Sequence, residues 1–341
     1  MRAQSIVLTA VAATALCGFS VYQAPKHFNP MIDVHIAKKP IFGLYAPANP
    51  RMGRGGGRGG VTPAGAPAGA PTTPPPQKST ADLVKDAFAY KPTDFIFDGS
   101  MEGNFDAGYA SFSEWMKAAT AEGMVDKTGY PHLHHPIAVK THEIAEDTAL
   151  AKERIGKQLN LGVSTIVFVG VESADEVKTG LNAMRFKSKG GSRPDDVGMA
   201  PQVWGMSEAE YKAKADVWPL NPQGEITNWT IVESKKGLEH IREIAAVKGI
   251  AVLFPGAGTL RGVFSTMDPA TNQRKFDEAA WENAIQQVLA ACKEFNVPCG
   301  YPANDPQTVE QRMKQGFSVF IAGWGDNGFK AVEYGKQASG R

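Results

Sequence analysis

Eight short apolar runs recur along the chain, and stretches with the spacing of amphipathic helices lie between them. The runs are Ile41–Ala46, Asp94–Asp98, Ile137–Lys140, Thr165–Gly170, Asn228–Glu233, Ala251–Phe254, Pro298–Tyr301 and Phe317–Ala322. Runs of about four to eight residues are typical of strands that are buried on both faces of a parallel sheet. The pattern therefore predicts a parallel sheet whose strands alternate with helices.

The stretches between these runs are expected to be helices. From Trp281 to Phe295, apolar residues recur at steps of four, three, four and three, which places them on one face of a helix. Glycines at 162, 249 and 316 are expected to end helices just before the next strand. Eight such repeats favour a single (β/α)8 TIM barrel over residues 36–338. An open doubly wound sheet is the alternative.

The first residues of the chain depart from this pattern. Arg2 precedes an apolar stretch from Ile6 to Phe19, and small residues follow near Ser20. The stretch is shorter than the roughly 20 residues of a membrane span, so residues 1–24 are predicted to be a secretory signal peptide. We expect an exported protein, periplasmic or secreted, with no membrane span after signal cleavage. An uncleaved anchor and a lipoprotein anchored at Cys17 are the alternatives.

A second departure is a Gly/Pro-rich stretch at residues 48–80. It has almost no large apolar side chains, so we expect a disordered or extended insertion. Because it follows the first strand, it is expected on the barrel's catalytic face. The net charge of +1 gives no reason to expect nucleic acid or an anionic membrane as a partner. Cys292 and Cys299 are expected in the core, where an oxidising compartment permits a disulfide between them.

The candidate chemistry lies at the ends of the predicted strands, because barrel enzymes build their sites from the C-terminal ends of strands. Asp98, Lys140, Glu233 and the glycine-rich loop 255–259 occupy these positions. A carboxylate there suits a divalent cation or a general base. The alternatives are a turn contact beside Gly99 for Asp98 and a helix-cap contact for Glu233.

The stretch from Thr230 to Leu260 resembles the central motif of the HpcH/HpaI aldolase and citrate lyase β-subunit family. In that family a metal-binding glutamate ends one strand, and the next strand ends in a Gly-x-x-Asp-Leu loop. Four further stretches match in the same order: Asp94–Gly99, Pro136–Lys140, Leu161–Val177 and Gly316–Trp324. The resemblance implies a phosphoenolpyruvate/pyruvate-type barrel, a homo-oligomer and a divalent metal, Mg or Mn. The metal would stabilise the enolate of a 2-oxo acid.

The sequence departs from the family pattern at four positions. Glu233 matches the metal-binding glutamate, but the aspartate ligand falls on Thr259 and a usual glutamine falls on Ile231. A usual histidine falls on Met101, and the arginine that polarises the substrate carbonyl falls on Lys140. Either the metal is recruited differently or it has been lost. Candidates to complete a metal shell are Glu102, His134, His135 and Asp268, although the two histidines precede a strand and are expected at the far face.

We therefore expect a lyase, aldolase-like, that cleaves or forms a C–C bond beside the carbonyl of a small-molecule 2-oxo acid or related carboxylate. Glu233 is the predicted metal ligand, and the predicted catalytic residues are Lys140, Asp98 and His142. The predicted substrate-binding residues are Gly256, Gly258, Thr259 and Arg193, the last with surface exposure as its alternative. Two further readings stay open: a metal-independent lyase or hydrolase with a Schiff base at Lys140, and a non-catalytic exported binding protein.

Overall fold

The computed structural model describes residues 26–49 and 76–341. The predicted signal peptide and most of the Gly/Pro-rich stretch therefore lie outside the described residues. Within the part that is described, no helix is long and apolar enough to cross a membrane.

Eight parallel strands form the centre of the structure, and each matches one of the predicted runs. They are β1 (Ile41–Tyr45), β2 (Phe95–Asp98), β5 (Ile137–Lys140), β6 (Thr165–Phe168), β8 (Ile226–Val232), β9 (Ile250–Pro255), β12 (Gly300–Pro302) and β13 (Val319–Ala322). Each strand pairs with the next in this order, and β13 pairs with β1. A bridge between Leu253 and Cys299 joins β9 to the residue before β12, so the ring of pairings is continuous. The predicted barrel is confirmed.

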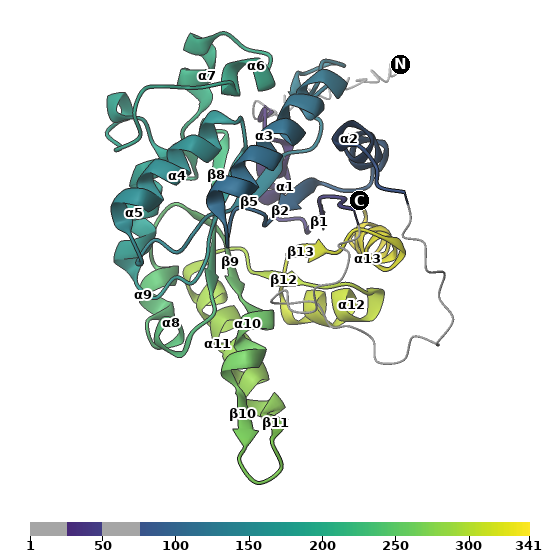
Figure 1. The fold of residues 1–341 in the computed structure, drawn as a ribbon, viewed down its shortest axis with the longest axis vertical. Coiled ribbons are helices and arrows are strands. Elements are labelled where there is room, and N and C mark those ends of the chain that lie inside the picture. Colours follow the sequence, from purple (N-terminus) through teal and green to yellow (C-terminus); the bar gives the residue numbers. More distant parts are fainter. Residues whose placement is uncertain (1–25, 50–75) are drawn as a thin grey trace, which may run out of the picture.

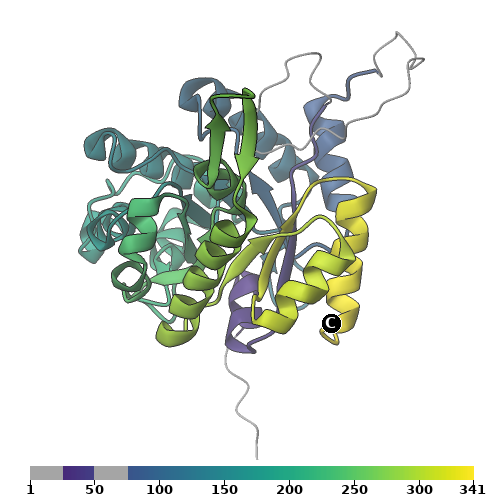
Figure 2. The same ribbon diagram turned by 90° about the horizontal axis from the view of Figure 1, so that it is seen from below.

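Helices surround this sheet, and at least one follows each strand (Figures 1 and 2). They are α2 (Thr80–Ala89), α3 (Phe105–Glu122), α4 (Thr148–Asn160), α5 (Ala174–Met184), α8 (Lys235–Glu239), α9 (Ile241–Ala245), α10 (Ala257–Val263), α11 (Glu278–Phe295), α12 (Pro306–Gln315) and α13 (Asp326–Ala338). Most begin at a side chain that accepts a backbone N–H, such as Asn104 for α3 and Asp147 for α4. Gly316 ends α12 with φ 115°, a left-handed conformation that favours glycine.

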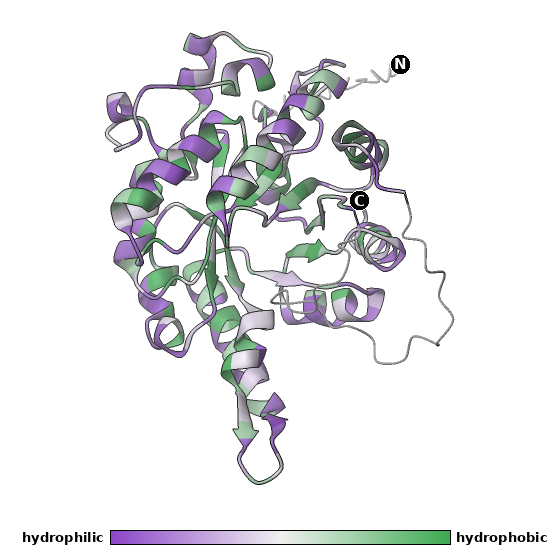
Figure 3. Cartoon of the chain, in the orientation of Figure 1, coloured by the Kyte–Doolittle hydropathy of each residue, from purple (hydrophilic) through white to green (hydrophobic). Residues whose placement is uncertain are grey.

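Large apolar side chains fill the inside of the barrel. Phe95, Phe97, Trp229, Ile231 and Phe254 belong to one inner cluster, and the strands are mainly hydrophobic in Figure 3. A short helix, α1 (Pro30–Ile36), closes the N-terminal end of the barrel by packing Met31 into this cluster. Because apolar side chains fill the interior, inward-facing polar side chains are expected at the opposite end, where the strands have their carboxyl ends. We call this end the mouth.

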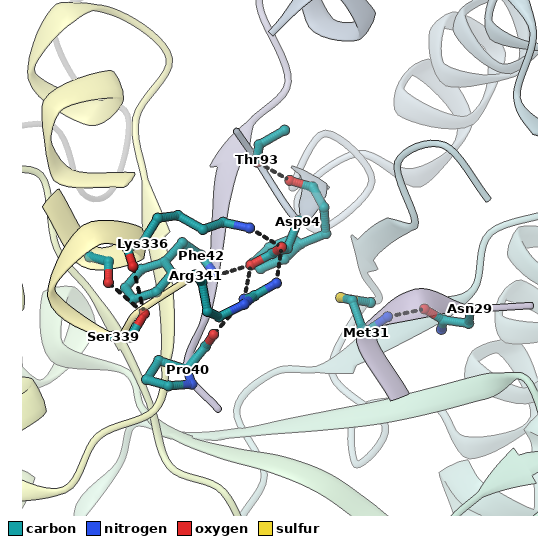
Figure 4. A network of polar contacts seen from close by, with 11 residues as sticks. Asn29, Met31, Pro40, Phe42, Thr93, Asp94, Lys336, Ser339 and Arg341 are labelled. Atoms are coloured by element: carbon teal, nitrogen blue, oxygen red, sulfur yellow. Dashed lines mark hydrogen bonds and ion pairs between the residues drawn. The ribbon is translucent and has the colours of Figure 1, made fainter. Parts of the chain in front are cut away.

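An ion-pair network fastens the C-terminus to the barrel (Figure 4). Both terminal guanidinium nitrogens of Arg341 donate to the carboxylate of Asp94, at 2.8 Å each, and the Lys336 ammonium donates to it at 2.5 Å. The same carboxylate accepts the backbone N–H of Phe42 at the start of β1. Asp94 thereby links α13, β1 and β2 at the end opposite the mouth.

Three additions extend the barrel. A hairpin of β3 (Val125–Asp126) and β4 (His132–Leu133) precedes β5, and the segment before β8 holds η1 (Lys187–Lys189), α6 (Ala200–Val203), α7 (Glu208–Lys214) and β7 (Val217–Trp218). A second hairpin, β10 (Ser265–Asp268) and β11 (Gln273–Phe276), extends away from the barrel between α10 and α11 (Figure 1).

Cys292 in α11 and Cys299 before β12 form a disulfide. Replacing both with alanine is expected to lower the free energy of unfolding by about 2.5 kcal/mol, because a short closed loop in the unfolded chain is released. Chemical denaturation would measure the change. A reducing agent should destabilise the native protein and leave the double variant unaffected; equal stability of the two proteins under oxidising conditions would contradict the assignment.

Candidate functional site

Alternation along the strands decides which side chains face the mouth. Glu233 follows Trp229 and Ile231 at steps of two, and Lys140 follows Ala138 in the same way. Since Trp229, Ile231 and Ala138 all belong to the inner cluster, Glu233 and Lys140 point inward at the carboxyl ends of β8 and β5. The two oppositely charged side chains therefore share the mouth.

The Glu233 carboxylate is enclosed by the backbone segments that follow its two neighbouring strands. Its Oε1 accepts the N–H of Gly170, which follows β6, at 3.1 Å. A Cβ at Gly256, which follows β9, would lie 2.6 Å from its Oε2. The helix-cap alternative does not describe Glu233, because the Ser234 hydroxyl accepts the Gly237 N–H and caps α8. Glu233 therefore does not cap α8, and its carboxylate lies at the mouth.

Lys140 is paired with Glu102, which lies in the loop after β2. The ammonium donates to Oε2 of Glu102 at 2.9 Å, and the Lys140 side chain is 18% exposed. Burial alone would lower the pKa of Lys140, but the charge and hydrogen bond of Glu102 outweigh it and raise the pKa above its ordinary value. Lys140 is therefore a cation at neutral pH, which disfavours the Schiff-base reading.

Asp98 and His142 lie beside this pair and are held by local contacts. Oδ1 of Asp98 accepts the backbone N–H and the hydroxyl of Ser100, so the turn contact expected as its alternative is present. Burial raises the pKa of Asp98 despite these bonds. The His142 ring faces two acceptors, the Glu102 carbonyl at 3.1 Å and the Glu146 carboxylate at 2.5 Å. Both ring nitrogens of His142 are therefore engaged by contacts within the protein.

Arg193 does not reach the mouth. The prediction that it binds the substrate is therefore wrong, and so is the alternative that it is exposed on the surface. Its side chain is buried, not exposed. The guanidinium donates to Asn160 at 2.7 Å and stacks on the Phe186 ring. Asn160 ends α4, just before β6 begins, so this contact lies at the N-terminal end of the barrel. Arg193 fastens the long segment before β8 to α4.

The candidates for completing a metal shell are not gathered around Glu233. Glu102 is paired with Lys140. His134 and His135 precede β5 at the far end, as expected, and burial lowers the pKa of His135 to about 3. Asp268 accepts the Ala270 N–H in the turn of the β10–β11 hairpin. Among the described residues, no group of three or more His, Cys, Asp or Glu side chains is arranged to hold a metal ion.

Two residues at the mouth were missed by the sequence reasoning. Glu143 lies against Gly170: if Gly170 had a Cβ, that atom would lie 2.8 Å from Oε1 of Glu143. Tyr45 is the last residue of β1 and faces inward. Burial first, then the charges of Glu146 and Glu233, raise the pKa of Glu143. The inward alternation of Ile41, Gly43 and Tyr45 could have revealed Tyr45, whereas Glu143 lies in a loop that no periodicity describes.

Two carboxylates, those of Glu233 and Glu143, lie near Gly170 and could contribute ligands to a divalent cation. Glu233 and Glu143 approach Gly170 from the ends of β8 and β5. Mg²⁺ is commonly held by one or two carboxylates, with water and substrate completing the shell. Thr259 is exposed in the first turn of α10, and Gly258 beside it is also exposed. Their substrate-binding roles stay predictions.

Residues 130–332 match the sequence profile of the HpcH/HpaI aldolase/citrate lyase family. The chain belongs to this family. The match covers more than half of the chain, contains Lys140, Glu143 and Glu233, and confirms the resemblance read from the motifs. Membership supports a carbon–carbon lyase as the general kind of function.

Two similar proteins are aldolases. The hydroxypyruvate/pyruvate aldolase of Paraburkholderia phytofirmans is 25% identical over 168 residues, covering 49% of this chain and 60% of that protein. The 2-dehydro-3,6-dideoxy-6-sulfogluconate aldolase of Pseudomonas putida is 24% identical over 179 residues, covering 51% and 61%. The chain thus matches about three fifths of the length of these relatives.

Solved structures show the same fold. The HpcH/HpaI aldolase from Desulfitobacterium hafniense superposes with a TM-score of 0.56 at 13% identity, covering 86% of this chain and 90% of that one. A family protein from Burkholderia cenocepacia gives 0.53 at 19% identity, covering 76% and 87%.

The close approach of Gly256 to Glu233 gives a direct test of the site's geometry. Gly256→Ala would place a methyl group 2.4 Å from the Glu233 Cβ, and we expect it to cost about 1–3 kcal/mol of stability. Gly258→Ala is the matched control, because a Cβ there meets nothing within 4 Å. Thermal unfolding would compare the two variants. Equal melting temperatures would show that Gly256 does not confine Glu233.

Proposed function

We propose that this protein is a carbon–carbon lyase that acts on a 2-oxo acid or a related carbonyl compound, assisted by Mg²⁺ or Mn²⁺. The observation that carries the proposal is the presence of opposite charges at one mouth: Glu233 and Glu143 each lie against Gly170, and the Lys140 cation faces inward two strands away from Glu233. A 2-oxo acid has matching features, an anionic carboxylate beside a carbonyl oxygen.

Each side chain at the mouth has a role in this proposal. Lys140 holds the substrate carboxylate, and Glu233 with Glu143 would hold the cation. When bound, the cation would act as a Lewis acid on the carbonyl oxygen and favour the enolate. Asp98 orients the loop that carries Glu102, through its bonds to Ser100. His142 would transfer a proton to or from the substrate after its contact with Glu146 is broken.

We also propose that the chain is exported to the periplasm or secreted, and that it assembles as a homo-oligomer. The apolar N-terminal stretch supports export. The Cys292–Cys299 disulfide agrees with it, because such bonds persist mainly in oxidising compartments. The oligomer rests on the family resemblance.

Glu233→Gln tests the metal directly. We expect the native protein to bind Mg²⁺ or Mn²⁺ in calorimetric titration, and Glu233→Gln and Glu143→Gln each to bind at least about tenfold more weakly, because a charged ligand is lost. Glu172→Gln is the control, since Glu172 bonds to Ser234 and Lys236 beside the mouth. It should bind nearly as the native protein does. Absence of binding by the native protein would exclude the metal-assisted reaction.

Borohydride trapping separates the remaining readings. Because Lys140 is a paired cation, incubation with pyruvate and borohydride should leave its mass unchanged by peptide mass spectrometry. A reduced adduct at Lys140 would instead establish the metal-independent reaction. If a panel of 2-oxo acids raises the melting temperature without any turnover, the protein is a binding protein.

A further inference from the structure

The Lys140 ammonium already has a carboxylate partner inside the protein. Glu102 accepts its hydrogen bond at 2.9 Å, and the pair lies at the mouth. In the proposed function the substrate carboxylate binds this same ammonium. The ammonium has three N–H donors, so a second carboxylate can bind beside Glu102, but the repulsion between the two carboxylates makes each weaken the binding of the other.

The backbone that carries Glu102 is fixed. Met101 is fully buried, and α3 packs so closely that a Cβ at Gly108 would lie 2.5 Å from the Ser100 carbonyl. The Glu102 carbonyl also accepts from His142. A movement of the whole loop would break all three contacts, which favours a response of the Glu102 side chain over a movement of the loop.

The Glu102 side chain, by contrast, is free to turn away. It is 39% exposed, and among the described residues its carboxylate is paired with Lys140 alone. A change of rotamer moves the carboxylate into solvent without disturbing the backbone. An exposed partner on a fixed backbone is well suited to reversible displacement.

We infer that Glu102 is an internal competitor for the substrate carboxylate, which occupies Lys140 until a ligand carboxylate displaces it. Glu102 is therefore a specificity-determining residue: it lowers the affinity of the mouth for carboxylates and leaves ligands without that charge unaffected. The inference rests on the proposed function, which assigns the substrate carboxylate to Lys140.

Binding of pyruvate to the full-length protein, measured by calorimetry in the presence of Mg²⁺, tests the inference. Glu102→Gln keeps the size of the side chain and removes its charge, so we expect pyruvate to bind about three- to tenfold more tightly. Glu102→Ala should give a similar gain. Methyl pyruvate, which lacks the negative charge, should bind both variants and the native protein within twofold.

Glu114→Gln is the matched control, because it breaks a Glu–Lys pair of similar length on the surface of α3, with Lys117 at 2.7 Å. It should not alter pyruvate affinity. Lys140→Met should weaken pyruvate binding in every background. If Lys140→Met weakens binding while Glu102→Gln does not strengthen it, the competition is wrong and the proposed anchor stands. If Lys140→Met has no effect, or the native protein binds no pyruvate, the proposed function fails, and the inference with it.

Discussion

The filling of the barrel by large apolar side chains is the constraint on which the site depends. Phe95, Phe97, Trp229 and Phe254 occupy the interior, where a charge without a partner would carry a large desolvation cost. Every inward-facing charge must therefore stand at the end of a strand. On β8 the inward-facing position changes from apolar Ile231 to charged Glu233 at the end of the strand, and on β5 it changes from Ala138 to Lys140 in the same way. Because the apolar interior excludes charges, both Glu233 and Lys140 lie at the same mouth of the barrel.

Small residues at the rim complete this arrangement. Gly170 donates its N–H to Glu233 and leaves room for Glu143. Gly256 leaves room for the other oxygen of Glu233. Gly256 in the loop after β9 is therefore explained by its close approach to the Glu233 side chain. A role of this loop in binding the substrate stays a prediction.

The strands, and the strand ends at which the candidate site lies, could be predicted because both follow from local periodicity. Apolar runs and helical spacing are properties of neighbouring residues, and the barrel rule then places strand ends together. Arg193 could not be placed in this way. Its partners, Asn160 and Phe186, lie in other segments. Arg193 is buried and connects these segments only because tertiary packing brings them together. Glu143 was missed for a related reason, since the approach of its loop to Gly170 depends on how β5 and β6 lie side by side.

The family positions that differ in this chain are best understood as a redistribution of charge. The aspartate expected after β9 is Thr259, which is exposed and uncharged, while Glu143 brings a carboxylate toward Glu233 from the end of β5. The arginine expected at the end of β5 is Lys140, which keeps the positive charge but loses the planar, two-pronged donor geometry of a guanidinium. A single ammonium can be held by one internal glutamate, and Glu102 provides it. The lysine and its glutamate therefore act as a pair, and the effect of the change from arginine to Lys140 has to be judged together with Glu102.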